Sequence, residues 1–389
     1  MKRFFSKDTN SANYDVFSEL YPVLNSYVLT EGDKEQSRNG VTMEILNFKT
    51  QVNPLYRCVG GYRRNINVYF LLAEALWIWA GRKDVKFLKI FNEKMAEYSD
   101  DGVNFHAPYG FRLRRWGLNS FDKAYKEGAQ HSLGQSTDQV EEAIKMLHSS
   151  PEDRRVVLQI WNPDLDLNKK SKDLPCNDTL MFKVRKKKLH ATIANRSNDL
   201  HLGLPTNIFQ FSFIGEFISS ILEVEYASQT HNSQSLHIYP EMNDIAYKMQ
   251  NLYVDEGWRS QLYDKCFPEK LYFNWCSSDP IKRLNQLDYW VNQIIEALSG
   301  YDEFDKPAKF SYGDLEDFSS SLAHIYSLLR LYVGYKKDLK IDGIDKNMVR
   351  NRCIGVIADM RNVHTDFNLL AQNFFFSRMG GQDNILGTL

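Results

Sequence analysis

Leu174-Pro175-Cys176-Asn177 opens the most informative part of this chain, because three further polar blocks follow it at short intervals. A cysteine alone indicates little, since free cysteines are usually small buried hydrophobes. A cysteine followed by an arginine, an amide and a His-x-Tyr pair predicts a pocket that holds an anionic heterocycle over a sulfur nucleophile. The three blocks are Arg196-Ser197-Asn198-Asp199, Leu202-Gly203-Leu204-Pro205-Thr206-Asn207-Ile208 and His237-Ile238-Tyr239.

The residues around these blocks predict an α+β fold. Apolar and β-branched residues fill 156–161, 180–184 and 189–194, which we expect to be strands. The apolar run over 207–222 predicts a long helix packed behind them.

The upstream sequence adds a strand and two helices to this fold. Loose alternation of apolar and polar residues predicts a strand over 41–52. Apolar residues at helical spacing predict a buried helix over 67–81 that ends at a glycine, and Ser136-Thr137-Asp138-Gln139 predicts the start of a helix through Leu147.

The part of the chain after Tyr239 has a different pattern. Segments 281–298, 315–333 and 348–370 have helical periodicity, with no repeat and no low-complexity linker. We therefore expect an α+β catalytic core over residues 1–245 and a mostly helical C-terminal extension over 246–389.

Composition excludes several classes of function. Lys and Arg number 48 against 49 Asp and Glu, which gives no net field that favours nucleic acid or an anionic membrane. The basic N-terminus has no apolar run behind it, so we expect no signal peptide, and no apolar stretch is long enough to span a bilayer. The five cysteines lack metal-site spacing, which favours a reducing, cytoplasmic setting, free thiols and no bound metal.

Residues from about 36 to 245 resemble the thymidylate synthase family, which includes the pyrimidine nucleotide hydroxymethylases. Each motif is weak alone, but together they follow the family's order with compatible spacing. The resemblance implies a large mixed β-sheet with packed helices. The motifs beyond the four blocks above are Ala73-Glu74-Ala75-Leu76-Trp77, Pro108-Tyr109-Gly110, Asp138-Gln139, Pro151-Glu152-Asp153-Arg154-Arg155-Val156-Val157 and Trp161-Asn162-Pro163.

The resemblance makes Cys176 the nucleophile that adds to C6 of a pyrimidine and turns the ring into an enolate. Only a few per cent of an unperturbed thiol is ionised at neutral pH, and the nearby Arg196 would raise that fraction. Tyr109 would be a polar partner near the nucleophile. The alternative for Cys176 is a buried, inert cysteine.

Arginines of the resembling motifs would hold the 5′-phosphate. Arg154, Arg155 and Arg196, with Ser197, would clamp it, since guanidinium groups match phosphate oxygens bidentately. Arg38 matches the family's phosphate loop loosely. In the family the paired arginines reach the neighbouring subunit's site, which implies a homodimer; the alternative for Arg154 and Arg155 is a solvated, salt-bridged turn.

Asn207 would read the base. An amide can donate to O4 and accept from N3–H of uracil, whereas aspartate there would suit cytosine, so dUMP is the expected substrate. The alternative is an asparagine that caps the helix over 207–222.

Other residues take their roles from the resemblance. Glu74, on an apolar helix, would relay protons at O4 and C5, because a buried carboxylate has a raised pKa; the alternative is a surface-facing glutamate. His237 and Tyr239 would hold the 3′-hydroxyl. Asp199 and Gly203 would contact the folate, which is expected to be 5,10-methylenetetrahydrofolate.

Three departures from the synthase pattern favour a hydroxymethylase, in which water rather than hydride reaches the 5-methylene intermediate. Met95 and Tyr98 stand where the synthase usually carries two tryptophans that pack the folate, and Asn177 replaces the usual histidine after the cysteine. The chain also runs on for about 145 residues after the His-x-Tyr block, with no matching closing tail. All three would loosen water exclusion or folate retention.

The leading hypothesis is therefore a dUMP hydroxymethylase that makes 5-hydroxymethyl-dUMP and tetrahydrofolate, such as would supply modified nucleotides to a phage in the host cytoplasm. The alternatives are a divergent thymidylate synthase, a dCMP hydroxymethylase and an inactive homologue that serves as a subunit or scaffold. Direct nucleic-acid or membrane binding is not expected. The sequence leaves the preference for ribose or deoxyribose and the role of the extension open.

Overall fold

A computed structural model describes residues 4–5, 16–37, 40–58, 66–118, 136–239, 242, 268–300, 310–360 and 365–379. Its strands are β1 (Phe4–Phe5), β2 (Asp33–Ser37), β3 (Gly40–Val52), β4 (Val157–Gln159), β5 (Asn177–Arg185), β6 (Lys188–Asn195), β7 (Asn198–Asp199) and β8 (Glu225–Ile238). Its helices are α1 (Val16–Glu31), α2 (Val68–Trp79), α3 (Val85–Phe91), the 3₁₀ helix η2 (Glu93–Tyr98), α4 (Tyr109–Arg114), α5 (Gln139–Ser149), α6 (Pro163–Asp166), α7 (Gly203–Ile221), α9 (Pro280–Ser299), α10 (Tyr312–Phe318), α11 (Ser320–Asp338), α12 (Lys346–Ala358) and α13 (Asp366–Phe376).

The strands of the described residues form one mixed sheet in the order β1-β3-β8-β6-β5-β4, with β2 paired to β3 and β7 to β8. β6 and β8 run parallel, while β5 is antiparallel to β6. This mixed sheet with packed helices confirms the predicted α+β fold class.

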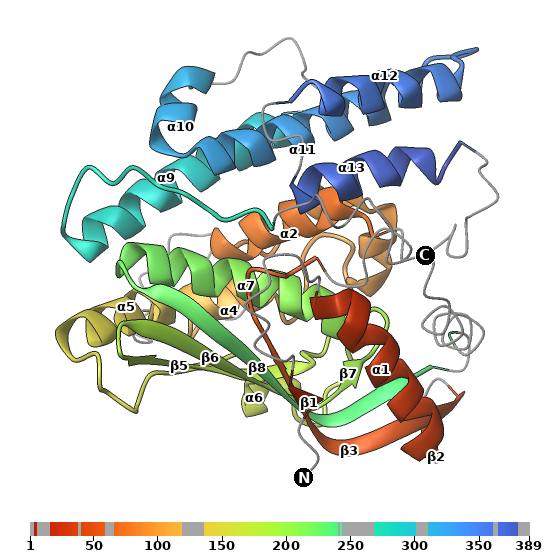
Figure 1. Cartoon of the computed structure of the whole chain (residues 1–389). Coiled ribbons are helices and arrows are strands. Elements are labelled where there is room, and N and C mark those ends of the chain that lie inside the picture. The colour runs from red at the N-terminus through yellow and green to blue at the C-terminus, as the bar shows by residue number, and fades with distance from the viewer. Residues whose placement is uncertain are drawn as a thin grey trace.

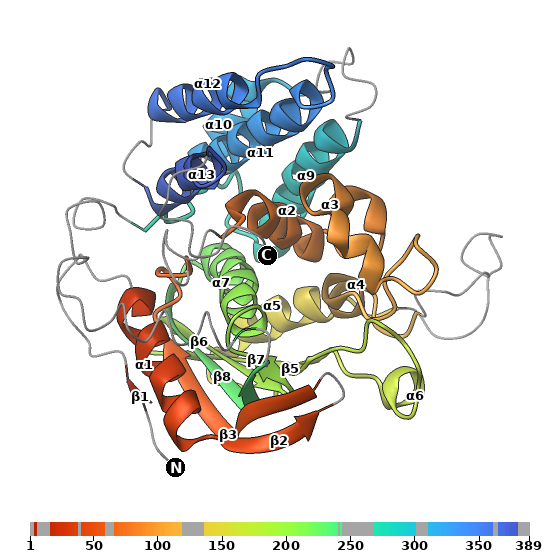
Figure 2. The same ribbon diagram turned by 90° about the vertical axis from the view of Figure 1, so that its right-hand side faces the viewer.

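The helices α2, α5 and α7 lie on one side of the sheet, and both views show this layering (Figures 1 and 2). The helix-facing side chains of β5 and β6, such as Phe182 and Ile193, are buried. The alternate side chains point to the other face, where Val157 and Lys183 are exposed. The side chains of β4, β5 and β6 on this face are therefore more exposed than those that face the helices.

α2 occupies the layer between the sheet-packed α7 and the C-terminal helices α9, α11 and α13 (Figure 1). Every residue of α2 except Phe70 and Glu74 is buried, which is typical of a helix that is apolar all round. Asn67 caps its start by accepting from the Phe70 amide. One hydrophobic cluster runs from this helix into the C-terminal helices, and the domain boundary predicted at residue 245 lies outside the described residues.

Two of the predicted C-terminal helices are interrupted. The segment 315–333 contains the end of α10 and most of α11, because Ser319 has an extended backbone and its side chain caps α11 by accepting from the Leu322 amide. The segment 348–370 likewise contains most of α12 and the start of α13, which Thr365 caps. The helix predicted over 281–298 is confirmed as α9.

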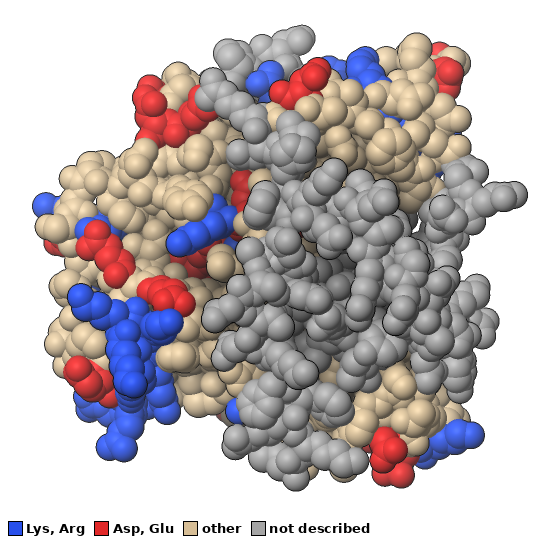
Figure 3. Space-filling view, in the orientation of Figure 1, with Lys and Arg blue, Asp and Glu red and all other residues tan. Residues whose placement is uncertain are grey.

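Positive charge gathers locally although the chain is nearly neutral. Figure 3 shows a compact group of Lys and Arg side chains beside several acidic ones on one face. The turn between β5 and β6 carries four consecutive basic residues, of which Lys186, Lys187 and Lys188 are exposed.

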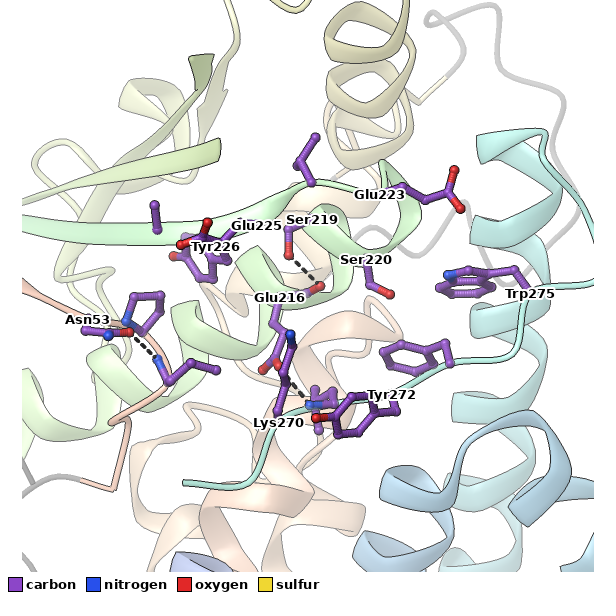
Figure 4. A pocket seen from close by; sticks show the side chains of 16 residues that line it. Asn53, Glu216, Ser219, Ser220, Glu223, Glu225, Tyr226, Lys270, Tyr272 and Trp275 are labelled. Carbon is purple, nitrogen blue, oxygen red and sulfur yellow. Dashed lines mark hydrogen bonds between the residues drawn. The ribbon is translucent and has the colours of Figure 1, made fainter. Parts of the chain in front are cut away.

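A cavity of about 490 Å³ lies between the end of α7, the start of β8 and residues 270–275 (Figure 4). Glu216 of α7 points toward that segment and accepts from the Leu271 amide at 2.8 Å. None of the site residues predicted from the sequence lines this cavity.

Candidate active site

Cys176 lies at the entrance to β5, with its side chain half-buried. Its backbone amide donates to Tyr109 Oη at 3.3 Å. Tyr109 begins α4, and its ring stacks on Phe211 of α7 with 6.3 Å between ring centroids. The backbone of Cys176 is therefore bonded to α4, which in turn packs on α7, so motifs that are distant in the sequence meet here.

Arg196, directly after β6, wraps the segment that carries the cysteine. Its Nε donates to the Pro175 carbonyl at 2.8 Å and its Nη2 to the Leu174 carbonyl at 3.3 Å. The same Nη2 lies 3.9 Å from Cys176 Sγ. The guanidinium also lies over the Trp161 ring, 5.7 Å from its centroid. Trp161 belongs to a quoted motif but had no predicted role.

Several groups act on the pKa of Cys176 in opposite directions. Burial raises the pKa of the thiol, Arg196 lowers it, and the carboxylates of Asp173, Asp178 and Asp199 raise it further. Arg196 acts in the predicted direction, but its effect is smaller than that of burial. Burial and the three carboxylates therefore oppose the effect of Arg196 at this thiol.

Asn177 and Asn207 contact one another directly. Asn177 is the first residue of β5, and its Nδ2 donates to Asn207 Oδ1 at 3.0 Å. Asn207 Nδ2 in turn donates to Asn198 Oδ1 at 3.3 Å. Asn207 lies inside α7, which begins at Gly203, so the alternative of a capping asparagine is wrong. Asn198 was quoted in a motif but had no predicted role.

Asp199 explains why α7 begins four residues earlier than predicted. Its carboxylate accepts from the amides of His201, Leu202 and Gly203 at 3.1, 2.6 and 3.3 Å. A carboxylate at a helix start satisfies unpaired amides and favours the positive end of the helix dipole. A Cβ at Gly203 would lie 3.3 Å from Asn198 Oδ1, so this close approach favours glycine.

His237 and Tyr239 follow at the end of β8, beside Asp199. Residues Asp199 and His237 are partners in the parallel β7–β8 pair. The rings of His237 and Tyr239 meet edge to face at 4.8 Å, and His237 Nδ1 lies 3.1 Å from Ser235 Oγ. Burial lowers the pKa of His237, which favours the neutral imidazole at pH 7.

Glu74 lies on α2 between buried neighbours, and its own side chain is partly exposed. Gln210 Nε2 donates to Glu74 Oε2 at 2.6 Å and also lies 3.2 Å from the Leu71 carbonyl. Burial raises the pKa of Glu74 to about 7, against the opposing effect of the Gln210 hydrogen bond. Sequence reasoning missed Gln210, although it stands three residues after Asn207 and so on the same face of α7.

Arg154 and Arg155 are not part of this cluster in a single chain. Both are exposed in the turn before β4. Arg155 Nη2 lies 2.6 Å from Asp153 Oδ2, with the arginine side chain 83% exposed. This ion pair lowers the pKa of Asp153 to about 2. Within one chain, therefore, Arg155 has the geometry of the salt-bridged turn.

The remaining predicted residues have simpler positions. Ser197 follows Arg196 and is half-buried. Met95 packs against the hydrophobic core from η2, whereas Tyr98 is 53% exposed on the same short helix. Arg38 lies outside the described residues.

No helix of the described segments is long and apolar enough to cross a membrane. The same segments hold no cluster of three or more His, Cys, Asp or Glu side chains placed to bind a metal ion.

The structure therefore brings the thiol, an arginine and the buried amide pair together within a mixed-sheet fold. The thymidylate synthase family model matches residues 19–260, and the chain belongs to that family. The resemblance stated from the motifs is thereby confirmed.

Three relatives illustrate where the chain falls within this family. Over 228 residues, it is 40% identical to a deoxyuridylate hydroxymethyltransferase of Bacillus phage SP01, and these residues are 57% of each chain. It is 35% identical over 221 residues to the same enzyme of Pseudomonas phage M6, covering 56% of this chain and 58% of the relative. A bifunctional dihydrofolate reductase-thymidylate synthase of Paramecium tetraurelia is 29% identical over 243 residues, which are 61% of this chain and 47% of the relative. The chain thus spans about half the length of these curated relatives.

Proposed function

We propose that this protein is a dUMP hydroxymethylase. It would transfer a one-carbon unit from 5,10-methylenetetrahydrofolate to C5 of dUMP and release 5-hydroxymethyl-dUMP and tetrahydrofolate. The observation that carries the proposal is the joint placement of Cys176, Arg196 and the Asn177–Asn207 pair. The names of the two phage relatives support the same reaction.

The chemistry begins at Cys176. Its thiolate adds to C6, which breaks the C5=C6 bond and makes the ring an enolate. C5 would then bond the folate's methylene carbon as the bond from that carbon to N10 breaks, and C5 would lose its proton to a base. Breaking the bond from the same carbon to N5 would release tetrahydrofolate and leave an exocyclic methylene. The oxygen of water would add to this methylene with loss of a proton, and departure of the Cys176 thiolate would restore the C5=C6 double bond.

Glu74 would move protons at O4 and C5 in these steps. Its pKa of about 7 lets the carboxyl group both give and accept a proton near neutral pH. Gln210 fixes one carboxylate oxygen, so the other can face water or the base.

The choice of water over hydride rests on Met95, Tyr98 and Asn177. A flexible thioether and a half-exposed phenol shield a methylene group less than two packed tryptophans would. Water that reaches the exocyclic methylene before hydride transfer gives the hydroxymethyl product.

The remaining roles follow from the family pattern. Arg196 and Ser197 would bind the 5′-phosphate together with Arg38, and His237 and Tyr239 would bind the 3′-hydroxyl. The folate would lie against Asp199, Gly203, Met95 and Tyr98. A cytoplasmic location, that of the host if the chain is phage-encoded, is part of the proposal.

A homodimer would complete the phosphate site. The more exposed face of β4, β5 and β6 is the surface that a second copy would cover, and Arg154 and Arg155 are exposed in the turn before β4. In the dimer these arginines would reach the partner's nucleotide, where phosphate would replace Asp153 as the partner of Arg155.

The reaction can be tested directly with purified protein, dUMP and methylenetetrahydrofolate. We expect a pyrimidine product heavier than dUMP by the mass of a hydroxymethyl group less a hydrogen, with no rise in dihydrofolate absorbance. Formation of dTMP with an equal amount of dihydrofolate would establish the synthase reaction instead. A parallel reaction with dCMP tests the base preference.

The shared site can be tested by complementation. Cys176→Ala and Arg155→Ala should each be nearly inactive, and their co-expressed mixture should regain activity, because one site of each heterodimer has both residues. A mixture that stays as inactive as its components would contradict sites shared between subunits.

A further inference from the structure

Five buried polar side chains form one directed series of hydrogen bonds, which we call the amide relay. Asn195 Nδ2 donates to Asn177 Oδ1, and Asn177 Nδ2 donates to Asn207 Oδ1 at 3.0 Å. Asn207 Nδ2 donates to Asn198 Oδ1 at 3.3 Å, and Asn198 Nδ2 donates to Ser233 Oγ at 3.0 Å. All five side chains are buried. Each amide therefore has its carbonyl toward the preceding member and its nitrogen toward the next.

The strand register explains why the relay exists in this chain. Asn177 and Asn195 are direct partners in the antiparallel β5–β6 pair, so their side chains meet on one face of the sheet. Asn177 stands where the motif pattern usually has histidine. Its amide carries a donor and an acceptor at opposite ends, and can transmit the direction set by Asn195 to Asn207.

The relay leaves Asn207 with one carbonyl lone pair and one N–H unused. The unused carbonyl lone pair and the unused N–H of Asn207 complement uracil, whose N3–H needs an acceptor and whose O4 needs a donor. Cytosine presents the reverse pattern, since N3 accepts and the N4 amino group donates. An unrestrained amide could rotate by half a turn and bind cytosine equally well.

The relay opposes that rotation. A reversed Asn207 would face the nitrogen of Asn177 with its own nitrogen, so the whole series would have to reverse. Asn195 Oδ1 has no hydrogen-bond partner among the described residues, so a reversed Asn195 would bury an N–H₂ group there without an acceptor. A buried donor without a partner is less tolerated than an under-satisfied carbonyl.

We propose that Asn177 and Asn195 are specificity-determining positioning residues, which hold the Asn207 amide in the orientation that accepts uracil and rejects cytosine. This inference rests on the proposed function, because it assumes that Asn207 contacts the base. The residues act through Asn207, with no need to touch the nucleotide themselves.

The test exchanges a donor for an acceptor within the relay. In Asn177→Asp, the carboxylate cannot donate to Asn207, which should reverse and present its donor to cytosine N3. In Asn195→Asp, the carboxylate cannot donate to Asn177, so the Asn177 amide should rotate by half a turn. The Asn207 amide should then rotate as well. We expect the ratio of kcat/KM for dCMP to that for dUMP to rise at least about tenfold in both variants, with a parallel change in the ratio of nucleotide Kd values from calorimetry.

The ratio separates positioning from general damage. A carboxylate near Cys176 will raise the pKa of the thiol and slow both substrates equally, which cancels in the ratio. Asn368→Asp makes the same exchange at a buried amide outside the relay and should leave the ratio unchanged within about twofold. Thermal unfolding of each variant identifies any that fails to fold, and either relay variant suffices for the comparison.

An unchanged ratio in a folded relay variant would overturn the inference. The proposed function fails separately, if the wild-type protein forms no hydroxymethylated product from dUMP. The binding ratio does not depend on turnover, so the relay can be judged even then.

Discussion

The nucleotide end of the sheet and the layer of C-terminal helices bury polar groups in different ways. At the sheet end, the amides of Asn177 and Asn207 bind one another, and Asn207 keeps a donor and an acceptor unused. In the helical layer, His324 lies between two acceptors, with Glu269 Oε1 at 2.8 Å from Nδ1 and Asn368 Oδ1 at 2.7 Å from Nε2. Both ring nitrogens of that histidine are therefore occupied.

The surroundings of these groups differ as well. Tyr69 of α2 stacks on Tyr332 of α11 with 4.7 Å between centroids and meets Phe374 edge to face at 5.3 Å. Such aromatic packing buries large apolar surfaces and joins α2 to the C-terminal helices. Burial alone would lower the pKa of His324, but its hydrogen bonds and the charge of Glu269 outweigh that effect and raise it.

The comparison separates structural from functional polar burial. His324, with both ring nitrogens bonded, joins elements of the helical layer, whereas Asn207, with an unused donor and acceptor, is available to a substrate. Variants in the two regions should therefore change different quantities: chemistry and nucleotide preference at the sheet end, and stability in the helical layer.

The largest effect should come from Cys176→Ala. Removal of the nucleophile should lower kcat by at least about 10⁴-fold, because no other group can add to C6. Urea unfolding should change little. Cys276→Ala, which removes an exposed thiol, is the control and should retain full activity; residual turnover in Cys176→Ala above one per cent would remove Cys176 from its assigned role.

The next largest effect should come from Arg57→Met. Arg57 is fully buried, pairs with Glu216 of α7 and donates to the Glu269 carbonyl at 3.0 Å, so it joins the sheet layer to the helical layer. Its loss leaves a buried carboxylate without its partner, and the free energy of unfolding should fall by about 3–5 kcal/mol.

The matched control for Arg57→Met is Arg352→Met, which breaks the exposed pair with Asp338 and should cost less than about 1 kcal/mol. In folded Arg57→Met protein the ratio of dCMP to dUMP turnover should stay unchanged. A shifted ratio would mean that the two regions are coupled.

The effect of Glu74→Gln on the free energy of unfolding should depend on pH. Burial raises the folded pKa of Glu74 from 4.5 to about 7, so the folded state binds more protons than the unfolded state between these values. Wild-type stability should fall as pH rises through this window. The glutamine variant should therefore gain about 2 kcal/mol over wild type at pH 8 and nothing at pH 4.5, as measured by urea unfolding at both pH values.

The exposed Glu93 provides the control for Glu74, because its pKa is lowered and Glu93→Gln should bring no such gain. If the free energy of unfolding of Glu74→Gln differed from that of wild type by the same amount at every pH, the result would contradict the raised pKa of Glu74. The same Glu74 variant should also lose about 10²–10⁴-fold in kcat, as expected for a proton-transfer group.

The smallest effect should come from Lys336→Ala. Lys336 Nζ lies 2.7 Å from Glu93 Oε1 and links α11 to η2 at the surface. Exposed ion pairs contribute little, so the free energy of unfolding should change by less than about 0.5 kcal/mol at low salt and still less at 0.5 M salt. A loss above about 1 kcal/mol would show that surface contacts also hold the helical layer.

Much of the fold could be predicted from local pattern. The strand over 41–52 and the helix over 67–81 have periodicities that their surroundings do not override. Errors arose where one side chain redirects the backbone: Ser319 separates α10 from α11, and Asp199 moves the start of α7 to Gly203. Such caps depend on a hydrogen bond that periodicity does not report.

Some residues of the candidate site could be predicted from the sequence, and others could not. Cys176, Arg196 and Tyr109 stand in motifs and meet in space as those motifs imply. Asn195 and Gln210 were missed, because each contacts a site residue only through strand register or helix packing.

The sequence by itself determined the family, the α+β class and the residue types of the candidate site, because these depend on motif order and on hydrophobic periodicity. Only the tertiary structure decided which polar groups are saturated and which are left for a ligand. It turned Asn177 from an isolated substitution into the centre of a directed relay, and it made burial outweigh Arg196 at Cys176. The physical reason is that hydrogen-bond partners and desolvation are properties of neighbours in space, which residues distant in the chain supply.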